Sequence, residues 1–156
     1  MSRRIVEAAT VADGAYNRLV LLVGPHGSGK TRALRAVAAE NSWPTINLGL
    51  ELAQSLVDVP PSRRPLAAAD ATDGPVAAQH AGVVAVDDIE VLFEPTLRLQ
   101  PLDLLKQASR SVVLVVAWPG SSSGATLTYA EPGSPEYRTF DTTGLSVLPI
   151  EWVSSL

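Results

Sequence analysis

The chain contains no cysteine, so neither a disulfide bond nor a thiolate metal site can form anywhere along it. It also lacks a long apolar run, because its apolar bursts are far shorter than the roughly 20 residues needed to span a bilayer. The first residues are charged and no continuous apolar segment follows them, which argues against a secretory signal. We therefore expect an intracellular protein with no membrane segment, and the lack of cysteine is compatible with a reducing compartment without requiring one.

Positive charge is in short supply as well. The formal net charge is −4, from 12 lysines and arginines against 16 aspartates and glutamates. Sequence-independent binding to nucleic acid depends on an excess of basic residues facing the phosphate backbone. We therefore expect no direct binding to DNA, and any role on nucleic acid would act through partner proteins.

The sequence does have enough apolar residues for one core. Its 156 residues fit a single domain, and 46% hydrophobic against 18% charged residues argue against disorder. We interpret residues 1–156 as one domain with three parts. These are an N-terminal helix (1–17), a core (18–118) and a C-terminal β-hairpin with a last strand (119–156).

Short apolar runs alternate with helix-forming segments along the core. This alternation predicts an α/β fold with a mostly parallel central sheet flanked by helices. Residues 58–81 mix proline, glycine and alanine without a clear period, and we predict a loop there with room for a short helix. Strands are predicted at 18–23, 44–48, 83–87 and 111–118, and helices at 2–13, 30–40, 50–57 and 97–109.

The C-terminal part has a different composition. Thr126–Ala130 and Tyr137–Phe140 are β-prone segments on either side of Glu-Pro-Gly-Ser-Pro, which is typical of a hairpin. Gly144–Ile150 predicts a last strand. Little sequence follows that strand, so we expect no helical lid.

A phosphate-binding motif follows the first predicted strand. Gly24–Thr31 fits G-x-x-x-x-G-K-[ST], in which glycines let backbone N–H groups surround a phosphate and the next helix presents its N-terminus to it. Lys30 should reach the β/γ oxygens and Thr31 should bind Mg²⁺. The alternative is a glycine-rich turn that only resembles the motif, and a solvent-facing role is the better interpretation of His26. The predicted nucleotide-binding residues are Gly24, Pro25, His26, Gly27, Ser28, Gly29, Lys30 and Thr31.

Acidic residues end the third predicted strand. Asp87 follows four apolar residues, and a buried strand would place it beside the phosphate loop, where its carboxylate can hold Mg²⁺ through water. Asp88 is a candidate to polarise the attacking water, with Glu90 as its competitor. The catalytic candidates are thus Lys30, Asp88 and Glu90. The alternative is that two acids simply end a strand at the surface.

The identity of the base is inferred from an absence. No N-K-x-D stretch for guanine occurs, so ATP is favoured over GTP. Tyr16, just before the first strand, is a candidate to stack on adenine, although a tyrosine at such a place is more often a half-buried anchor.

Hydrolysis requires positive charge against the transition state. The helix predicted at 97–109 contains Arg98, and Arg110 follows its end. Both side chains could project toward a neighbouring subunit of a homo-oligomer. Trp118 and Pro119 offer no polar side chain to the γ-phosphate, although Ser121–Ser123 follow them. We therefore expect the isolated chain to bind ATP better than it hydrolyses it. The candidate arginines, each more often a solvated surface residue, are Arg63, Arg64, Arg98, Arg110 and Arg138.

Several segments resemble the BrxF P-loop proteins of BREX bacteriophage-defence systems. The likeness covers most of the chain from Leu19 to Asp141, and its most specific parts are Phe93–Pro95, Tyr129–Gly133 and Glu136–Arg138. The segments that carry it are GPHGSGKT, INLGLELAQSLVDVPPSRRP, VVAVDDIEVLFEP, LQPLDLLKQASRS, VVAWPG and LTYAEPGSPEYRTFD.

The resemblance implies a single P-loop NTPase domain of the additional-strand class in a bacterial cytoplasmic accessory ATPase. Its partners would be a larger ATPase, a methyltransferase and an alkaline-phosphatase-like protein that restrict phage DNA. The residues that carry over are Gly24–Thr31 for phosphate and Asp87 for Mg²⁺. The family tail maps onto the predicted hairpin, which is either a docking element or a ribbon covering a sheet edge.

Three functions remain open at this stage. The first is a nucleotide-switched subunit in which ATP binding, with slow or partner-stimulated hydrolysis, controls assembly. The second is a P-loop kinase for a small molecule, which needs an arginine-bearing lid for which residues 58–81 supply only Arg63 and Arg64. The third is a structural module in which ATP is not hydrolysed and only stabilises the fold.

Overall fold

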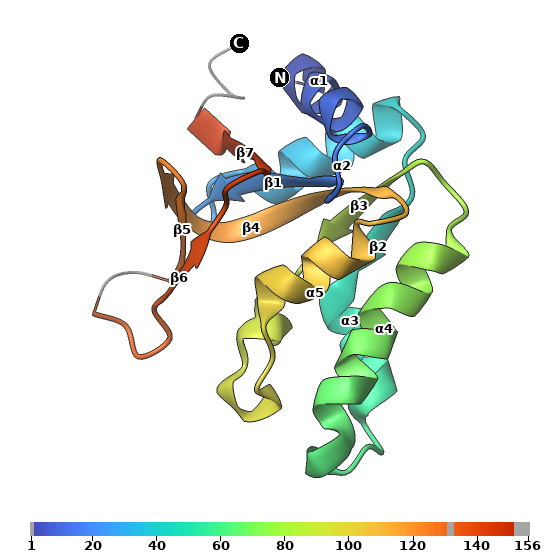
Figure 1. Cartoon of the computed structure of the whole chain (residues 1–156), viewed down its shortest axis with the longest axis vertical. Coiled ribbons are helices and arrows are strands. Elements are labelled where there is room, and N and C mark those ends of the chain that lie inside the picture. The colour runs from blue at the N-terminus through green and yellow to red at the C-terminus, as the bar shows by residue number, and fades with distance from the viewer. Residues whose placement is uncertain (1, 131–132, 152–156) are drawn as a thin grey trace.

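The computed structural model describes residues 2–130 and 133–151. Strands and helices alternate along it (Figure 1). The strands are β1 (Leu19–Gly24), β2 (Thr45–Asn47), β3 (Val83–Asp87), β4 (Val113–Ser123), β5 (Thr126–Tyr129), β6 (Arg138–Asp141) and β7 (Ser146–Pro149). The helices are α1 (Ser2–Ala12), α2 (Lys30–Glu40), α3 (Leu48–Leu56), α4 (Arg64–Ala78) and α5 (Pro101–Ala108), with short 3₁₀ turns η1 (Pro61–Arg63), η2 (Glu90–Phe93) and η3 (Pro95–Leu97).

Five strands form an open parallel sheet in the order β2-β3-β4-β1-β7. The predicted α/β class, with a mostly parallel sheet between helices, is therefore confirmed. Strand β4 lies between β1 and β3, so those two strands are not neighbours although both end at the same edge of the sheet. In open α/β sheets, ligands bind outside the carboxyl ends of the strands.

Each face of the sheet has its own apolar core. Helices α1 and α2 cover one face, and α3, α4 and α5 cover the other, as Figure 1 shows. Alternate residues of β1 point to opposite faces, so Leu21 joins the core of α3 to α5 while Val20 and Leu22 join that of α1 and α2. A strand buried on both faces reads as a continuous apolar run, which is why the strands were predictable.

The predicted hairpin and last strand are confirmed. β5 and β6 pair antiparallel, and β7 pairs parallel with β1. The predicted turn residues Glu131 and Pro132 lie outside the described residues. Strand β4 runs past the predicted boundary at residue 118, because Gly120–Ser123 pair antiparallel with β5. The hairpin is thus a continuation of a core strand rather than a separate appendage.

The prediction of a loop at 58–81 is wrong, because α4 occupies 15 of these residues. Pro65 stands in the first turn, where a missing backbone N–H costs nothing. Ala68 and Val76 are buried against the core shared with α3 and α5, and this tertiary packing holds a helix whose sequence has only a weak apolar period. Pro75 also lies within the helix.

The helix predicted at 97–109 begins later than expected. Pro101 occupies its first turn, and the chain before it forms η2 and η3 instead. Arg98 follows η3 in a left-handed conformation (φ 52°), so it is not on the helix as predicted. Helix α3 begins two residues before the predicted position, because Asn47 caps it by accepting a hydrogen bond from the Leu50 N–H at 2.9 Å.

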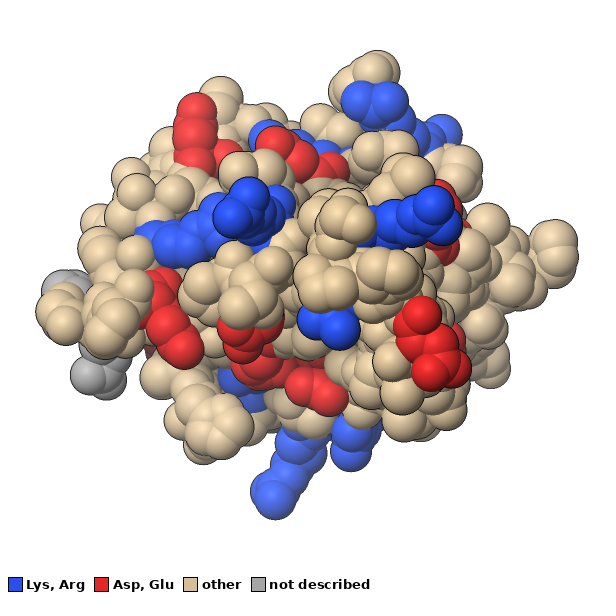
Figure 2. All heavy atoms as spheres, turned by 90° about the horizontal axis from the view of Figure 1, so that it is seen from below, with Lys and Arg blue, Asp and Glu red and all other residues tan. Residues whose placement is uncertain are grey.

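Charged side chains of both signs lie on the surface. In Figure 2, blue basic and red acidic side chains are interspersed on the face shown, and neither forms one continuous patch. Among residues 2–130 and 133–151, no helix combines the length and apolarity that crossing a membrane requires.

Candidate functional site

The glycine-rich loop joins β1 to α2 at the carboxyl edge of the sheet. Gly27 and Gly29 have φ of 80° and 94°, a left-handed conformation that residues with a Cβ rarely adopt. The first N–H groups of a helix have no partner within the helix. Gly29 is the N-cap of α2 and makes no side-chain cap, so these N–H groups of α2 are available to a ligand. Such a loop and helix terminus suit an anion.

A cavity of 1140 Å³ opens above this loop. It gathers residues predicted separately from the loop motif and from the acidic strand end. Among the predicted site residues, Gly24 and Pro25 do not line it. Arg32, Arg35 and Asn47 line it and were not predicted. The full lining is His26, Gly27, Ser28, Gly29, Lys30, Thr31, Arg32, Arg35, Asn47, Asp87, Asp88 and Glu90.

Gly24 has a structural role beneath the loop. A Cβ at this position would overlap the Ser28 hydroxyl and press on the Ile150 side chain. The first glycine of the motif thus allows the loop to fold back closely over β1, with Ile150 packed beside it. Pro25 contributes its carbonyl, which accepts hydrogen bonds from the Ser28 N–H (3.1 Å) and the Lys30 ammonium (3.4 Å).

Lys30 is a buried ammonium with few partners. Its residue is 5% exposed, and Pro25 O at 3.4 Å is the partner for Nζ among the described residues. Burial lowers the pKa of Lys30, and the negative charges of Glu90 and Asp87 partly oppose this. A phosphate held by the loop would supply the nearby negative charge that stabilises the ammonium form, so the site fits such a group.

Thr31 and Asp87 meet across 56 residues of sequence, from the start of α2 and the end of β3. The Thr31 hydroxyl donates to Asp87 Oδ1 at 3.1 Å, and the Asp88 N–H donates to the same oxygen at 2.8 Å. A hydroxyl beside a carboxylate fits Mg²⁺, which keeps several waters and takes only one or two protein ligands. No cluster of three or more His, Cys, Asp or Glu suited to a metal occurs in the described part of the chain.

Asp88 and Glu90 both reach the cavity but in different environments. Asp88 is exposed, has a left-handed φ of 58°, and lies against Gly49, whose N–H donates to the Asp88 carbonyl at 2.9 Å. Glu90 is half-buried, and its Oε2 is buried with no hydrogen-bond partner in the part of the chain that the structure describes. Burial, and then the neighbouring Asp88 carboxyl, raises the pKa of Glu90. Glu90 is therefore the better placed of the two to hold a proton or a water.

The tip of β4 lies beside the loop but presents no polar group to the cavity. Pro119 is in register with Gly24, and Trp118 is fully buried with its indole N–H donating to the Thr128 carbonyl at 2.9 Å. The serines after Pro119 lie in the ribbon with β5, where Ser121 and Thr128 hydroxyls are 2.7 Å apart. Strand β4 is a neighbour of β1, and Ser121, Ser122 and Ser123 do not line the cavity.

Tyr16 lies at the wrong end of β1 to stack on a base at this loop. A six-residue strand separates it from Gly24, a distance of about 20 Å. Tyr16 is 75% exposed, so it is no half-buried anchor either; the Arg110 guanidinium lies 5.5 Å from its ring centroid. The adenine-stacking interpretation is therefore wrong, and Arg110 shares this far edge.

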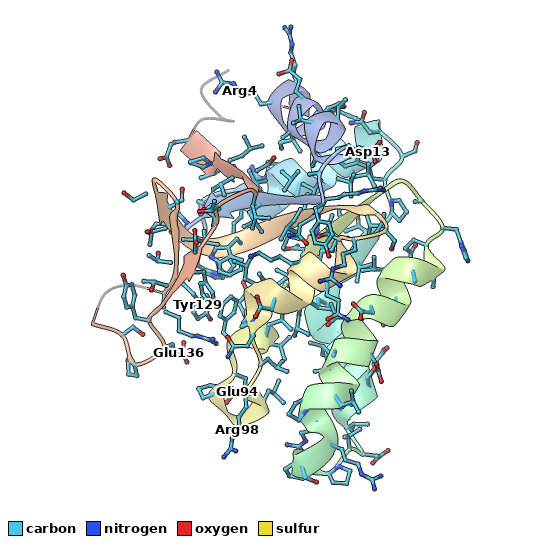
Figure 3. All side chains as sticks on the ribbon, in the orientation of Figure 1. Arg4, Asp13, Glu94, Arg98, Tyr129 and Glu136 are labelled. Carbon is cyan, nitrogen blue, oxygen red and sulfur yellow. The ribbon has the colours of Figure 1, made fainter. Side chains whose placement is uncertain are left out.

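The remaining candidate arginines do not line the cavity of their own chain. Arg138 donates to Gln100 at 3.4 Å, and Arg64 donates to the Val59 carbonyl at 3.0 Å. Arg98 lies at the outer end of the η2–η3 segment and points away from the sheet (Figure 3). The arginine that does meet a site residue is Arg35, whose Nη2 lies 3.5 Å from Asp87 Oδ2.

A scan against family models finds no match, and a search of curated proteins finds no significant match.

Proposed function

We propose that this chain is a P-loop protein of the additional-strand class that binds ATP with Mg²⁺ and hydrolyses it slowly on its own. The observation that carries the proposal is one cavity shared by three features. These are the left-handed glycine loop, the buried Lys30 ammonium, and the hydrogen-bonded pair Thr31 and Asp87. Each feature suits a different part of a nucleoside triphosphate with its metal: the loop suits a phosphate, the ammonium its negative charge, and the Thr31–Asp87 pair Mg²⁺.

The strand order supports the same proposal. In additional-strand proteins a further strand separates the strand that precedes the phosphate loop from the strand that ends in the acidic residue. Here β4 separates β1 from β3, with Gly24 in register with Pro119 and Val86 with Val116. The loop and Asp87 thus face one another across a strand rather than lying on adjacent strands.

Each residue has a distinct part in this proposal. The backbone of Gly27 to Lys30 surrounds the β-phosphate, and Lys30 neutralises the phosphate oxygens. Thr31 and Asp87 would hold Mg²⁺, which supplies charge stabilisation to the phosphates when bound. Glu90, or Asp88, orients the attacking water. Described arginines other than Arg32 and Arg35 lie away from the cavity, so hydrolysis is slow until a partner or a second copy supplies a cation.

We further propose a cellular role that rests on the sequence resemblance alone. In that role the chain is a cytoplasmic accessory subunit of a BREX-like bacterial anti-phage system. Its ATP-bound state controls assembly with the larger ATPase, the methyltransferase and the phosphatase-like protein, without direct DNA binding.

The kinase alternative loses its support from residues 58–81. That segment forms α4, packed on α3 and α5, and neither Arg63 nor Arg64 lines the cavity. A measurement separates the two activities: radiolabelled γ-phosphate released as inorganic phosphate without an acceptor supports the ATPase, and transfer of label to a metabolite supports a kinase.

The binding proposal is tested by thermal stability with and without ATP·Mg²⁺. ATP at about 100 times its dissociation constant should add about 2.7 kcal/mol to the free energy of unfolding. Lys30→Ala should abolish this gain. Lys106→Ala is a matched control, since Lys106 does not line the main cavity. Unchanged ATP affinity in Lys30→Ala would remove the central assignment.

Hydrolysis is tested separately from binding. The rate of phosphate release is measured for the wild type, Asp88→Asn and Glu90→Gln. It should fall most in Glu90→Gln, because the Glu90 carboxyl is more buried than that of Asp88. ATP-dependent stabilisation without phosphate release, alone or with partner proteins, would leave the structural module as the correct function.

A further inference from the structure

We propose that Arg35 is a positioning residue that holds Asp87 in the cation-free site and opposes the entry of the cation. The inference rests on the proposed function, because it concerns the same Asp87 that would hold Mg²⁺. It adds a control on metal occupancy that the phosphate motif does not contain.

The position of Arg35 follows from helix geometry. Residues four apart lie on the same face of a helix, so Arg35 stands one turn beyond Thr31 on the side of α2 that faces the cavity. Its side chain is 63% exposed, while that of Asp87 is 9% exposed. The arginine therefore reaches from solvent across the mouth of the cavity to a buried carboxylate.

The two oxygens of Asp87 have different partners. Oδ1 accepts hydrogen bonds from the Thr31 hydroxyl (3.1 Å) and the Asp88 N–H (2.8 Å). Oδ2 lies 3.5 Å from Arg35 Nη2, its partner among the described residues. A buried carboxylate is costly without a nearby positive charge, and Arg35 adds such a charge on the Oδ2 side, beyond that of the nearby Lys30 ammonium.

A divalent cation needs the same carboxylate. Two positive groups at one buried carboxylate repel each other, and the repulsion is stronger in a half-buried cavity than in water. The exposed Arg35 side chain can swing into solvent at little cost, whereas Asp87 and Thr31 are fixed by β3 and α2. Entry of the cation is therefore coupled to release of Arg35.

The experiment measures metal dependence rather than turnover. ATP affinity is determined by calorimetry over a series of free Mg²⁺ concentrations. The series runs from a solution in which a chelator removes free Mg²⁺ to millimolar Mg²⁺. In the wild type, some free Mg²⁺ concentration gives half of the full gain in ATP affinity. We expect Arg35→Gln to lower that concentration by about tenfold, which is equivalent to about 1.4 kcal/mol. Arg35→Lys, which keeps a positive charge, should remain close to the wild type.

Arg32→Gln is the matched control. Arg32 lies on the same helix, lines the same cavity and loses the same charge on substitution. Among the described residues, Asp87 pairs with Arg35 and makes no hydrogen bond or ion pair with Arg32. Equal Mg²⁺ requirements in the wild type and Arg35→Gln would overturn the proposal. So would a shift in Arg32→Gln as large as that in Arg35→Gln, because the effect would then come from net charge alone.

A second measurement separates this inference from the proposed function. Mn²⁺ alone is titrated into the nucleotide-free protein and followed by electron paramagnetic resonance. Tighter Mn²⁺ binding by Arg35→Gln than by the wild type and Arg32→Gln supports the role of Arg35 even where ATP does not bind. Failure of the wild type to bind ATP at any Mg²⁺ concentration would overturn the proposed function, whereas unchanged Mn²⁺ affinity would overturn the role of Arg35.

Discussion

Phe93 and Tyr129 stack face to face, with ring centroids 3.6 Å apart and ring planes within 2° of parallel. Phe93 ends η2, three residues after Glu90, and Tyr129 ends β5. Phe93 also meets Trp118 edge to face at 5.1 Å. The segment that carries the candidate catalytic carboxylate is thereby packed directly against the hairpin and against the strand next to the phosphate loop.

Loss of the Phe93 ring should destabilise the fold strongly. Phe93 is 4% exposed and contacts the rings of Trp118, Tyr129 and Phe140. Phe93→Ala should lower the free energy of unfolding by about 3 to 5 kcal/mol, measured by urea denaturation. Phe93→Leu, which keeps most of the volume, should lose much less. Equal losses in the two variants would show that volume in this core does not matter and would contradict the packing described.

Gly120 should tolerate no side chain. A Cβ there would overlap the Thr128 carbonyl across the β4–β5 pair. Gly120→Ala should destabilise the protein by about 1 to 3 kcal/mol, because backbone must move to make room. Gly82→Ala is the control, since a Cβ at Gly82 meets nothing within 4 Å, and its effect should stay within about 0.5 kcal/mol. Similar thermal stability of both variants would mean that the ribbon is not closed as described.

Glu90 should make stability depend on pH. Its folded pKa is raised above the ordinary 4.5 by burial and by Asp88. The folded state then binds the proton more tightly than the unfolded state, so this stabilising contribution is present below pH 4.5 and is lost as pH rises through the folded pKa. Glu90→Gln should therefore become more stable relative to the wild type as pH rises from 4 to 8. A constant difference in urea midpoints across this range would refute the direction of the pKa shift.

Asn47 should contribute as a helix cap. Its Oδ1 accepts a hydrogen bond from the Leu50 N–H at 2.9 Å, at the start of α3. Asn47→Ala should cost about 1 kcal/mol of unfolding free energy, while Asn47→Ser should retain most of the cap. Chemical denaturation of the three proteins measures this. Loss of the same size in the serine variant would indicate that Asn47 acts through the cavity rather than through the cap.

Much of the fold could be predicted because its signals are local. The strands are continuous apolar runs. Helix α2 was predicted with its observed bounds, because it begins directly after Gly29 and the residues that follow Lys30 favour a helix. The loop residues from His26 to Thr31 and the acids at and after the end of β3 were predicted because each set lies within a few residues of sequence, where local patterns fix the chemistry. Their meeting at one edge follows from the parallel sheet.

The errors lie where distant packing decides. Helix α4 owes its stability to burial of Ala68 and Val76 against α3 and α5, and its own sequence shows little amphipathic period. Arg35 was not predicted as a site residue. Its contact with Asp87 joins residues 52 apart in the chain, and only the spacing of four from Thr31 hinted at it.

Strand β4 belongs to two pairings in succession. Residues up to Pro119 pair with β1, those from Val113 to Val116 also pair with β3, and Gly120–Ser123 pair with β5. A pulling force applied to the hairpin along β4 would load the hydrogen bonds to β1 and β3 together in shear, rather than opening them one after another. Force exerted by a protein bound to the hairpin would therefore be transmitted directly to β4, the strand beside the phosphate loop.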